Sequence, residues 1–187
     1  DYPRVGCGPL KEAIADYEHT KKEYLICGNG AADLIFSLSR ALNPKKALLP
    51  APTFAEYEQA LVSVGCEISR YYLKEENDFC IQKDYPDVLK REKPDIIFLC
   101  NPNNPTGITI PQDLLEEILE TCAMQGIFMV VDECFLDFVK DPEKHTLKGK
   151  LEKYPGLFIL KAFTKRYAIP GVRLGYGFCS DREVLDR

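Results

Sequence analysis

The chain has 187 residues, of which 45% are hydrophobic and 28% charged, and a net charge of −5 from 24 basic and 29 acidic side chains. This composition is typical of a globular protein with one substantial core. The sequence contains no run rich in Lys and Arg and no apolar stretch near the roughly 20 residues of a membrane helix, which argues against nucleic-acid-binding and membrane-spanning proteins.

Short apolar runs alternate with longer amphipathic stretches along the chain, and each type of stretch predicts a different element. In chain order we predict a helix at 9–17, a helix at 31–42, a strand at 47–49, a helix at 54–64, a strand at 67–73, a helix at 85–91, a strand at 96–100, a helix at 111–125, strands at 128–131, 157–161 and 175–179, and a helix that begins near Ser180.

The strands at 96–100 and 128–131 read Ile-Ile-Phe-Leu-Cys and Phe-Met-Val-Val, with no polar alternation. Such runs are typical of strands buried on both faces of a parallel sheet. The sequence therefore predicts one α/β domain over 1–187, with a mostly parallel sheet between two layers of helices.

Eight cysteines are spread through the chain without a C-x-x-C pair, and only two histidines are present. Zinc sites need closely spaced Cys and His ligands, so we predict no metal site. We interpret the cysteines as free thiols of a cytoplasmic protein.

Polar residues follow three predicted strands at their carboxyl ends, where open α/β sheets bind ligands. The run Asn-Pro-Asn-Asn-Pro-Thr-Gly at 101–107 follows one strand, Asp132 the second, and Thr164 and Lys165 the third. The alternative is that these residues form turns and helix caps. For each strand alone, turns and caps explain the residues as well as a ligand site does, but they explain all three strands together less well.

Two further stretches have the composition of an anion site. Glycines at 28 and 30 precede the helix at 31–42, whose first N–H groups could hold a phosphate, although Asn29 or Asp33 could instead simply cap this helix. Arg173 offers a guanidinium for a phosphate or carboxylate. Lys165 could act as a nucleophilic amine if burial desolvates it; the alternative is a surface lysine beside a structural arginine.

These motifs, together with Asp-Glu-Cys-Phe-Leu-Asp-Phe at 132–138 and Thr-Lys-Arg-Tyr-Ala-Ile-Pro-Gly at 164–171, resemble the fold-type I enzymes that use pyridoxal 5′-phosphate (PLP). The sequence is similar to the histidinol-phosphate aminotransferase branch, and most of all to its threonine-phosphate decarboxylase subfamily. The resemblance covers the whole chain and implies the large domain of the aspartate-aminotransferase fold.

The resemblance implies roles for individual residues. Lys165 resembles the Schiff-base lysine and Asp132 the carboxylate that holds the pyridine nitrogen protonated. Asn104 resembles the donor to the ring 3-oxygen, and Phe54, with Tyr57 as a weaker candidate, the aromatic that stacks on the ring. The remaining matches concern the cofactor phosphate: Ala31, Ala32, Thr164 and Arg173 in the same subunit, and Tyr2 reaching the partner subunit of a homodimer.

The implied reaction is decarboxylation of L-threonine O-3-phosphate, a phosphorylated amino acid, to an aminopropanol phosphate in cobalamin biosynthesis. Phe135 favours this reaction, because aminotransferases of the branch usually carry Tyr there. Transamination, as in histidinol-phosphate aminotransferases, is the alternative, and a non-catalytic truncated domain is a third. The family's N-terminal arm and C-terminal small domain have no counterpart in the sequence, so we expect the 187 residues alone to be catalytically silent.

Overall fold

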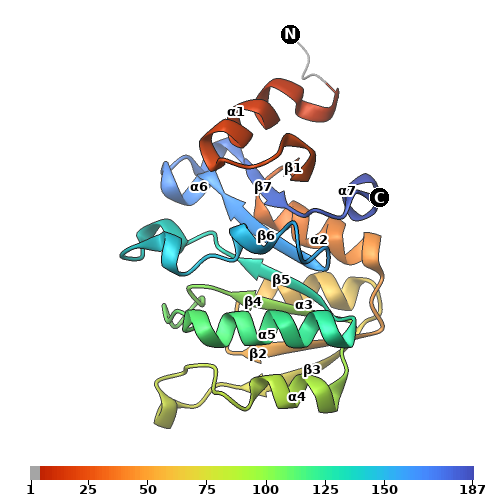
Figure 1. The fold of residues 1–187 in the computed structure, drawn as a ribbon, viewed down its shortest axis with the longest axis vertical. Coiled ribbons are helices and arrows are strands. Elements are labelled where there is room, and N and C mark those ends of the chain that lie inside the picture. Colours follow the sequence, from red (N-terminus) through yellow and green to blue (C-terminus); the bar gives the residue numbers. More distant parts are fainter. Residues whose placement is uncertain (1–4) are drawn as a thin grey trace.

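The computed structural model describes residues 5–187, which form a seven-stranded sheet with helices on both faces (Figure 1). The order of the strands across the sheet is β1-β7-β6-β5-β4-β2-β3. Their bounds are β1 Leu25–Gly28, β2 Lys46–Ala51, β3 Glu67–Tyr72, β4 Ile96–Cys100, β5 Phe128–Asp132, β6 Leu157–Ala162 and β7 Gly175–Phe178.

Only β7 runs against its neighbours, since it is antiparallel to both β1 and β6, and the pairs among β2 to β6 are parallel. The carboxyl ends of the other six strands therefore share one edge of the sheet, and β7 begins at that edge. The prediction of a mostly parallel sheet is confirmed.

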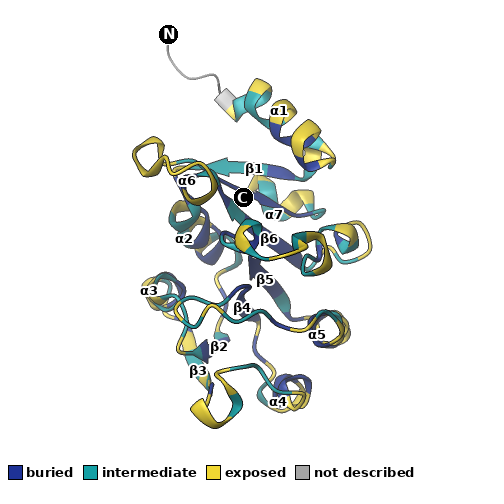
Figure 2. Cartoon of the chain, turned by 90° about the vertical axis from the view of Figure 1, so that its left-hand side faces the viewer, coloured by how far each residue is buried: buried dark blue, intermediate teal, exposed yellow. Residues whose placement is uncertain are grey.

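Helices cover the two faces in separate layers, as Figure 2 shows for α2 and α3 on one side and α4 and α5 on the other. Each layer buries its own apolar cluster against the sheet. One layer consists of α1 (Gly8–Glu18), α4 (Tyr85–Glu92) and α5 (Gln112–Gln125), and the other of α2 (Ala31–Leu42), α3 (Ala55–Ser63) and α7 (Arg182–Asp186). A single turn, α6 (Phe163–Arg166), follows β6 directly.

The predicted elements all occur, with ends that shift by one or two residues, and the sequence missed β1 and α6. β1 is only four residues long and ends in Gly28. In the described part of the sheet its one neighbour is β7, far along the chain, so no local pattern marks it as a strand.

Two further properties of the chain concern membrane-spanning helices and cysteines. In the described part of the chain, none of the helices is both long and apolar enough to cross a membrane. All eight cysteines are free, and the five buried ones, Cys66, Cys100, Cys122, Cys134 and Cys179, pack as small hydrophobes.

Candidate functional site

A pocket of about 110 Å³ lies at the carboxyl edge of the sheet and collects residues from six strand ends. Eight of the nine residues selected from the sequence line it, and the ninth, Tyr2, lies outside the described residues. The lining residues are Ala31, Ala32, Phe54, Asn104, Asp132, Thr164, Lys165 and Arg173, together with Cys100, Cys134, Phe135 and Ala162.

The topology explains why residues so far apart in sequence meet here. The turn after β1 leads into Ala31 at the start of α2, and Phe54 follows β2. β4 leads to Asn104 and β6 to Lys165, while Asp132 is the last residue of β5. Arg173 reaches the same edge only because β7 is antiparallel and begins there.

Asp132 is 5% exposed, and each of its carboxylate oxygens accepts one hydrogen bond. Oδ2 accepts a hydrogen bond from the Tyr57 hydroxyl at 2.6 Å, and Oδ1 accepts one from the Cys134 N–H at 2.9 Å. Burial and the Asp132 charge raise the pKa of Tyr57 well above the usual tyrosine value, so the phenol remains a donor.

The role of Tyr57 beside Asp132 was not predicted from the sequence. Among the described residues that line the pocket, the aromatic ones are Phe54 and Phe135. Tyr57 packs behind them, with its ring edge-on to Phe54 at 5.5 Å between centroids. The spacing of three residues on a helix places Tyr57 near Phe54, but no pattern in the sequence names Asp132 as its acceptor.

Lys165 is exposed, which contradicts the expectation that burial desolvates it. It stands in the single turn of α6, and the segment that follows is itself exposed, so the described chain does not cover it. Its Nζ lies 5.2 Å from the centroid of the Phe135 ring. Arg173 is exposed as well, and neither cation has a carboxylate partner among the described residues.

The start of α2 meets Arg173 and β7 at two glycines. A Cβ on Gly175 would lie 2.5 Å from the Ala31 nitrogen, and a Cβ on Gly30 would lie 2.6 Å from Nη2 of Arg173. At Gly175 the opposing atoms are backbone and cannot move aside, and at Gly30 a φ of 91° favours glycine. Gly30 is the N-cap of α2, so the alternative that Asn29 caps the helix is wrong, whereas the Asp33 carboxylate in the first turn accepts a hydrogen bond from the Asn29 N–H at 2.9 Å.

The arrangement favours an anion at this end of the pocket. The first N–H groups of α2 carry the positive end of the helix dipole, and Arg173 adds a full charge. The buried thiols nearby are not competing nucleophiles, because burial and the Asp132 carboxylate raise the pKa of Cys100 to about 12 and that of Cys134 well above the usual value. Lys165 is the amine in the lining.

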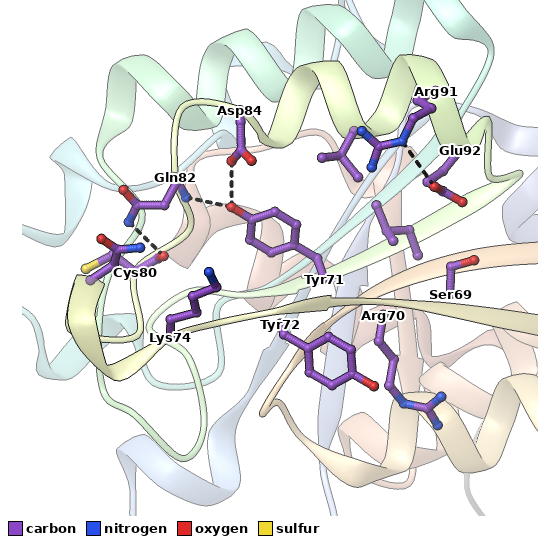
Figure 3. A pocket seen from close by; sticks show the side chains of 13 residues that line it. Ser69, Arg70, Tyr71, Tyr72, Lys74, Cys80, Gln82, Asp84, Arg91 and Glu92 are labelled. Atoms are coloured by element: carbon purple, nitrogen blue, oxygen red, sulfur yellow. Dashed lines mark hydrogen bonds and ion pairs between the residues drawn. The ribbon is translucent and has the colours of Figure 1, made fainter.

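A second, roomier cavity of about 600 Å³ lies between the edge strand β3 and α4 (Figure 3). Some of its polar groups bind one another: the Tyr71 hydroxyl donates to Asp84 Oδ1 at 2.6 Å, and Arg91 pairs with Glu92. Burial and the Asp84 hydrogen bond raise the pKa of Tyr71 to about 12. No residue selected from the sequence lines this cavity.

Comparisons with known proteins agree with the geometry. Residues 2–187 match the family described as aminotransferase class I and II. The chain is 36% identical to the threonine-phosphate decarboxylase of Salmonella typhimurium, over 100% of the chain and 50% of that protein. It is 32% identical to the histidinol-phosphate aminotransferase of Ruminiclostridium cellulolyticum, over 97% of the chain and 50% of that protein.

A solved structure shows the same fold. The histidinol-phosphate aminotransferase of Clostridium acetobutylicum superposes with a TM-score of 0.89 at 32% identity, and the match covers 100% of this chain and 54% of the other. The chain thus spans about half the length of the curated relatives it matches. By its sequence match and its fold, the chain belongs to the aminotransferase class I and II family.

Proposed function

We propose that the pocket at the carboxyl edge binds PLP. The observation that carries this proposal is that one pocket brings together a lysine, a buried carboxylate, an amide, an aromatic ring and an anion cradle. The cradle fits a phosphate, because the glycines at 30 and 175 let the start of α2 approach Arg173 and β7 closely, and Arg173 has no carboxylate partner in the described chain.

Each group would then have a distinct task. Arg173, Thr164 and the N–H groups of Ala31 and Ala32 would bind the phosphate, and Phe54 would cover the ring. Asp132 would hold a proton on the pyridine nitrogen, and Lys165 would hold the cofactor covalently, with the aldehyde oxygen lost as water, and later move a proton. Bound PLP supplies an electron sink for the electrons released when a bond at the substrate Cα breaks.

We propose decarboxylation of L-threonine O-3-phosphate as the reaction of the full-length protein, with residues 1–187 as its cofactor-binding large domain. The Salmonella relative is a threonine-phosphate decarboxylase, and Phe135 leaves the pocket without the phenol usual in aminotransferases of this branch. Transamination is the second candidate, supported by the histidinol-phosphate aminotransferase relative.

We also propose that the active unit is a homodimer. Next to Lys165, the segment after α6 exposes three large apolar side chains, Tyr167, Ile169 and Val172. Exposed apolar patches of this kind mark association surfaces. The molar mass of the full-length protein, measured by light scattering, tests this proposal, and a monomer at micromolar concentration would contradict it.

The test of the reaction uses the full-length protein with PLP and phosphothreonine. We expect release of carbon dioxide without keto-acid formation, together with a visible absorption band from the lysine-bound cofactor. Lys165→Ala should abolish both. Keto-acid formation with no carbon dioxide would favour transamination instead.

Lys153→Ala is the matched control. Lys153 precedes β6 and so lies at the opposite edge of the sheet, and its Nζ also faces an aromatic ring, that of Tyr154, at 4.9 Å. The visible band should survive in Lys153→Ala. If Lys165→Ala forms as much borohydride-reducible PLP adduct as the wild type, Lys165 does not have the proposed role.

A further inference from the structure

Behind the pocket, Tyr57 makes a contact with Asp132 that the tasks above do not use. Tyr57 is fully buried on the inner side of α3, where its ring stacks on Phe98 at 5.0 Å between centroids and 17° between planes. The ring of Phe54 also packs against it, at 82° between planes. The phenol is therefore held in one orientation by apolar packing.

The carboxylate of Asp132 is bound from two sides by groups that are themselves fixed. The Tyr57 hydroxyl donates to Oδ2 from α3, and the Cys134 N–H donates to Oδ1 from the backbone after β5. A carboxylate oxygen can accept more than one hydrogen bond, so these two bonds set the plane of the group and leave acceptor capacity for a third partner in the pocket.

The chemistry of this hydrogen bond favours a fixed rather than a titrating role. A donor bound to a carboxylate in a low-dielectric site makes a strong, charge-assisted bond. Burial raises the pKa of Tyr57 well above the usual value, so the phenol keeps its proton and cannot share the negative charge. The charge stays on Asp132, which lines the pocket, while Tyr57 remains behind it.

We propose that Tyr57 is a positioning residue, which holds the Asp132 carboxylate aimed at a cationic pyridine nitrogen in the pocket. This inference rests on the proposed function. Tyr57 does not touch the cofactor in this proposal, and it acts only through Asp132. It also gives α3 a task in the site, since Phe54 at the N-cap of that helix and Tyr57 inside it would fix the ring and its carboxylate partner together.

The experiment compares PLP with an analogue that has carbon in place of the pyridine nitrogen. Affinities for both are measured by fluorescence titration of the full-length protein. The wild type should prefer PLP, and Tyr57→Phe should lose about tenfold of that preference, the lower end of the effect of a hydrogen bond to a charged group. In the Asp132→Asn background, Tyr57→Phe should have no further effect, because the two residues act as one unit.

Tyr85→Phe is the matched control. Tyr85 is also fully buried and packs perpendicular to another tyrosine, but its hydroxyl has no hydrogen-bond partner among residues 5–187 and lies in the cluster on the other face of the sheet. Tyr85→Phe should keep the full preference for PLP. A general effect of removing a buried hydroxyl would appear in both variants and would overturn the inference.

Other outcomes separate this inference from the proposed function. Equal weakening of PLP and analogue in Tyr57→Phe would show a merely structural tyrosine and overturn the inference, as would a Tyr57→Phe protein with the full wild-type preference. A wild type that binds both compounds alike, or an Asp132→Asn variant that keeps the preference for PLP, would overturn the proposed function and the inference with it.

Discussion

At the scale of single residues, the pocket separates its charges. Asp132 is buried and carries two hydrogen bonds, whereas Lys165 and Arg173 are exposed and have no carboxylate partner among the described residues. A buried, hydrogen-bonded carboxylate is held in one orientation, while exposed cations can adjust to an incoming anion. The anionic end of a ligand would thus meet the adaptable side of the pocket and its cationic end the fixed side.

Arg173→Gln tests the anionic end. We expect PLP binding to weaken by about tenfold to a hundredfold, since a hydrogen bond to a charged group contributes about 1.5–3 kcal/mol. Binding of pyridoxal, which has no phosphate, should hardly change. Equilibrium dialysis of both compounds measures the difference. A variant that loses pyridoxal and PLP equally would place Arg173 away from the phosphate.

At the scale of elements, the start of β7 and the start of α2 fit together only through glycine. Gly175 begins β7, and the backbone of Gly30 and Ala31 lies against it. Arg173, in a left-handed conformation at φ 52°, stands two residues before Gly175 and packs beside Gly30. The anion cradle is therefore a junction between two elements rather than a property of one loop.

Gly175→Ala should disturb this junction. The added methyl would collide with backbone atoms, which cannot rotate away, so we expect a loss of about 1–3 kcal/mol in the free energy of unfolding and weaker PLP binding. Gly149→Ala is the control, because a Cβ at Gly149 meets nothing within 4 Å. Urea denaturation of both variants measures the effect. Equal stability of the two would show that α2 and β7 can separate at low cost.

The sequence predicted most of the helices and strands but fewer of the contacts between single residues. The strand at 96–100 and the helix at 31–42 have their predicted ends, because their apolar patterns are long and bounded by turn residues. Strand β1 was missed because its partner is distant. The contact between Tyr57 and Asp132 could not be predicted, since it depends on where α3 packs over the sheet and not on either residue's neighbours.

At the scale of the whole molecule, one buried carboxylate should make the free energy of unfolding depend on pH. Glu133 is 1% exposed and accepts hydrogen bonds from the Thr146 hydroxyl at 2.8 and 2.9 Å. Burial raises the pKa of Glu133 from 4.5 to about 7, against the opposing effect of Lys161. Between these two values the folded state keeps a proton that the unfolded state has lost, so stability falls as pH rises through this window.

Glu133→Gln should remove this pH dependence of the free energy of unfolding. Relative to the variant, the wild type should lose roughly 3 kcal/mol in the free energy of unfolding as pH rises from 4.5 to 7, and the difference should be constant above and below that range. Chemical denaturation at a series of pH values measures it. Parallel curves for the two proteins across the window would show that Glu133 is ionised in the folded state.

The antiparallel β7 also determines when the pocket is completed during synthesis. A ribosome releases the chain from its amino end, so β1 and α2 leave the tunnel long before Gly175 does. Among the described strands β1 pairs with β7 alone, and the cradle at the start of α2 lacks Arg173 until the same segment emerges. A nascent chain that has just exposed Lys165 would therefore present its amine and Asp132 with a phosphate cradle that still lacks Arg173, and cofactor capture would follow the emergence of β7.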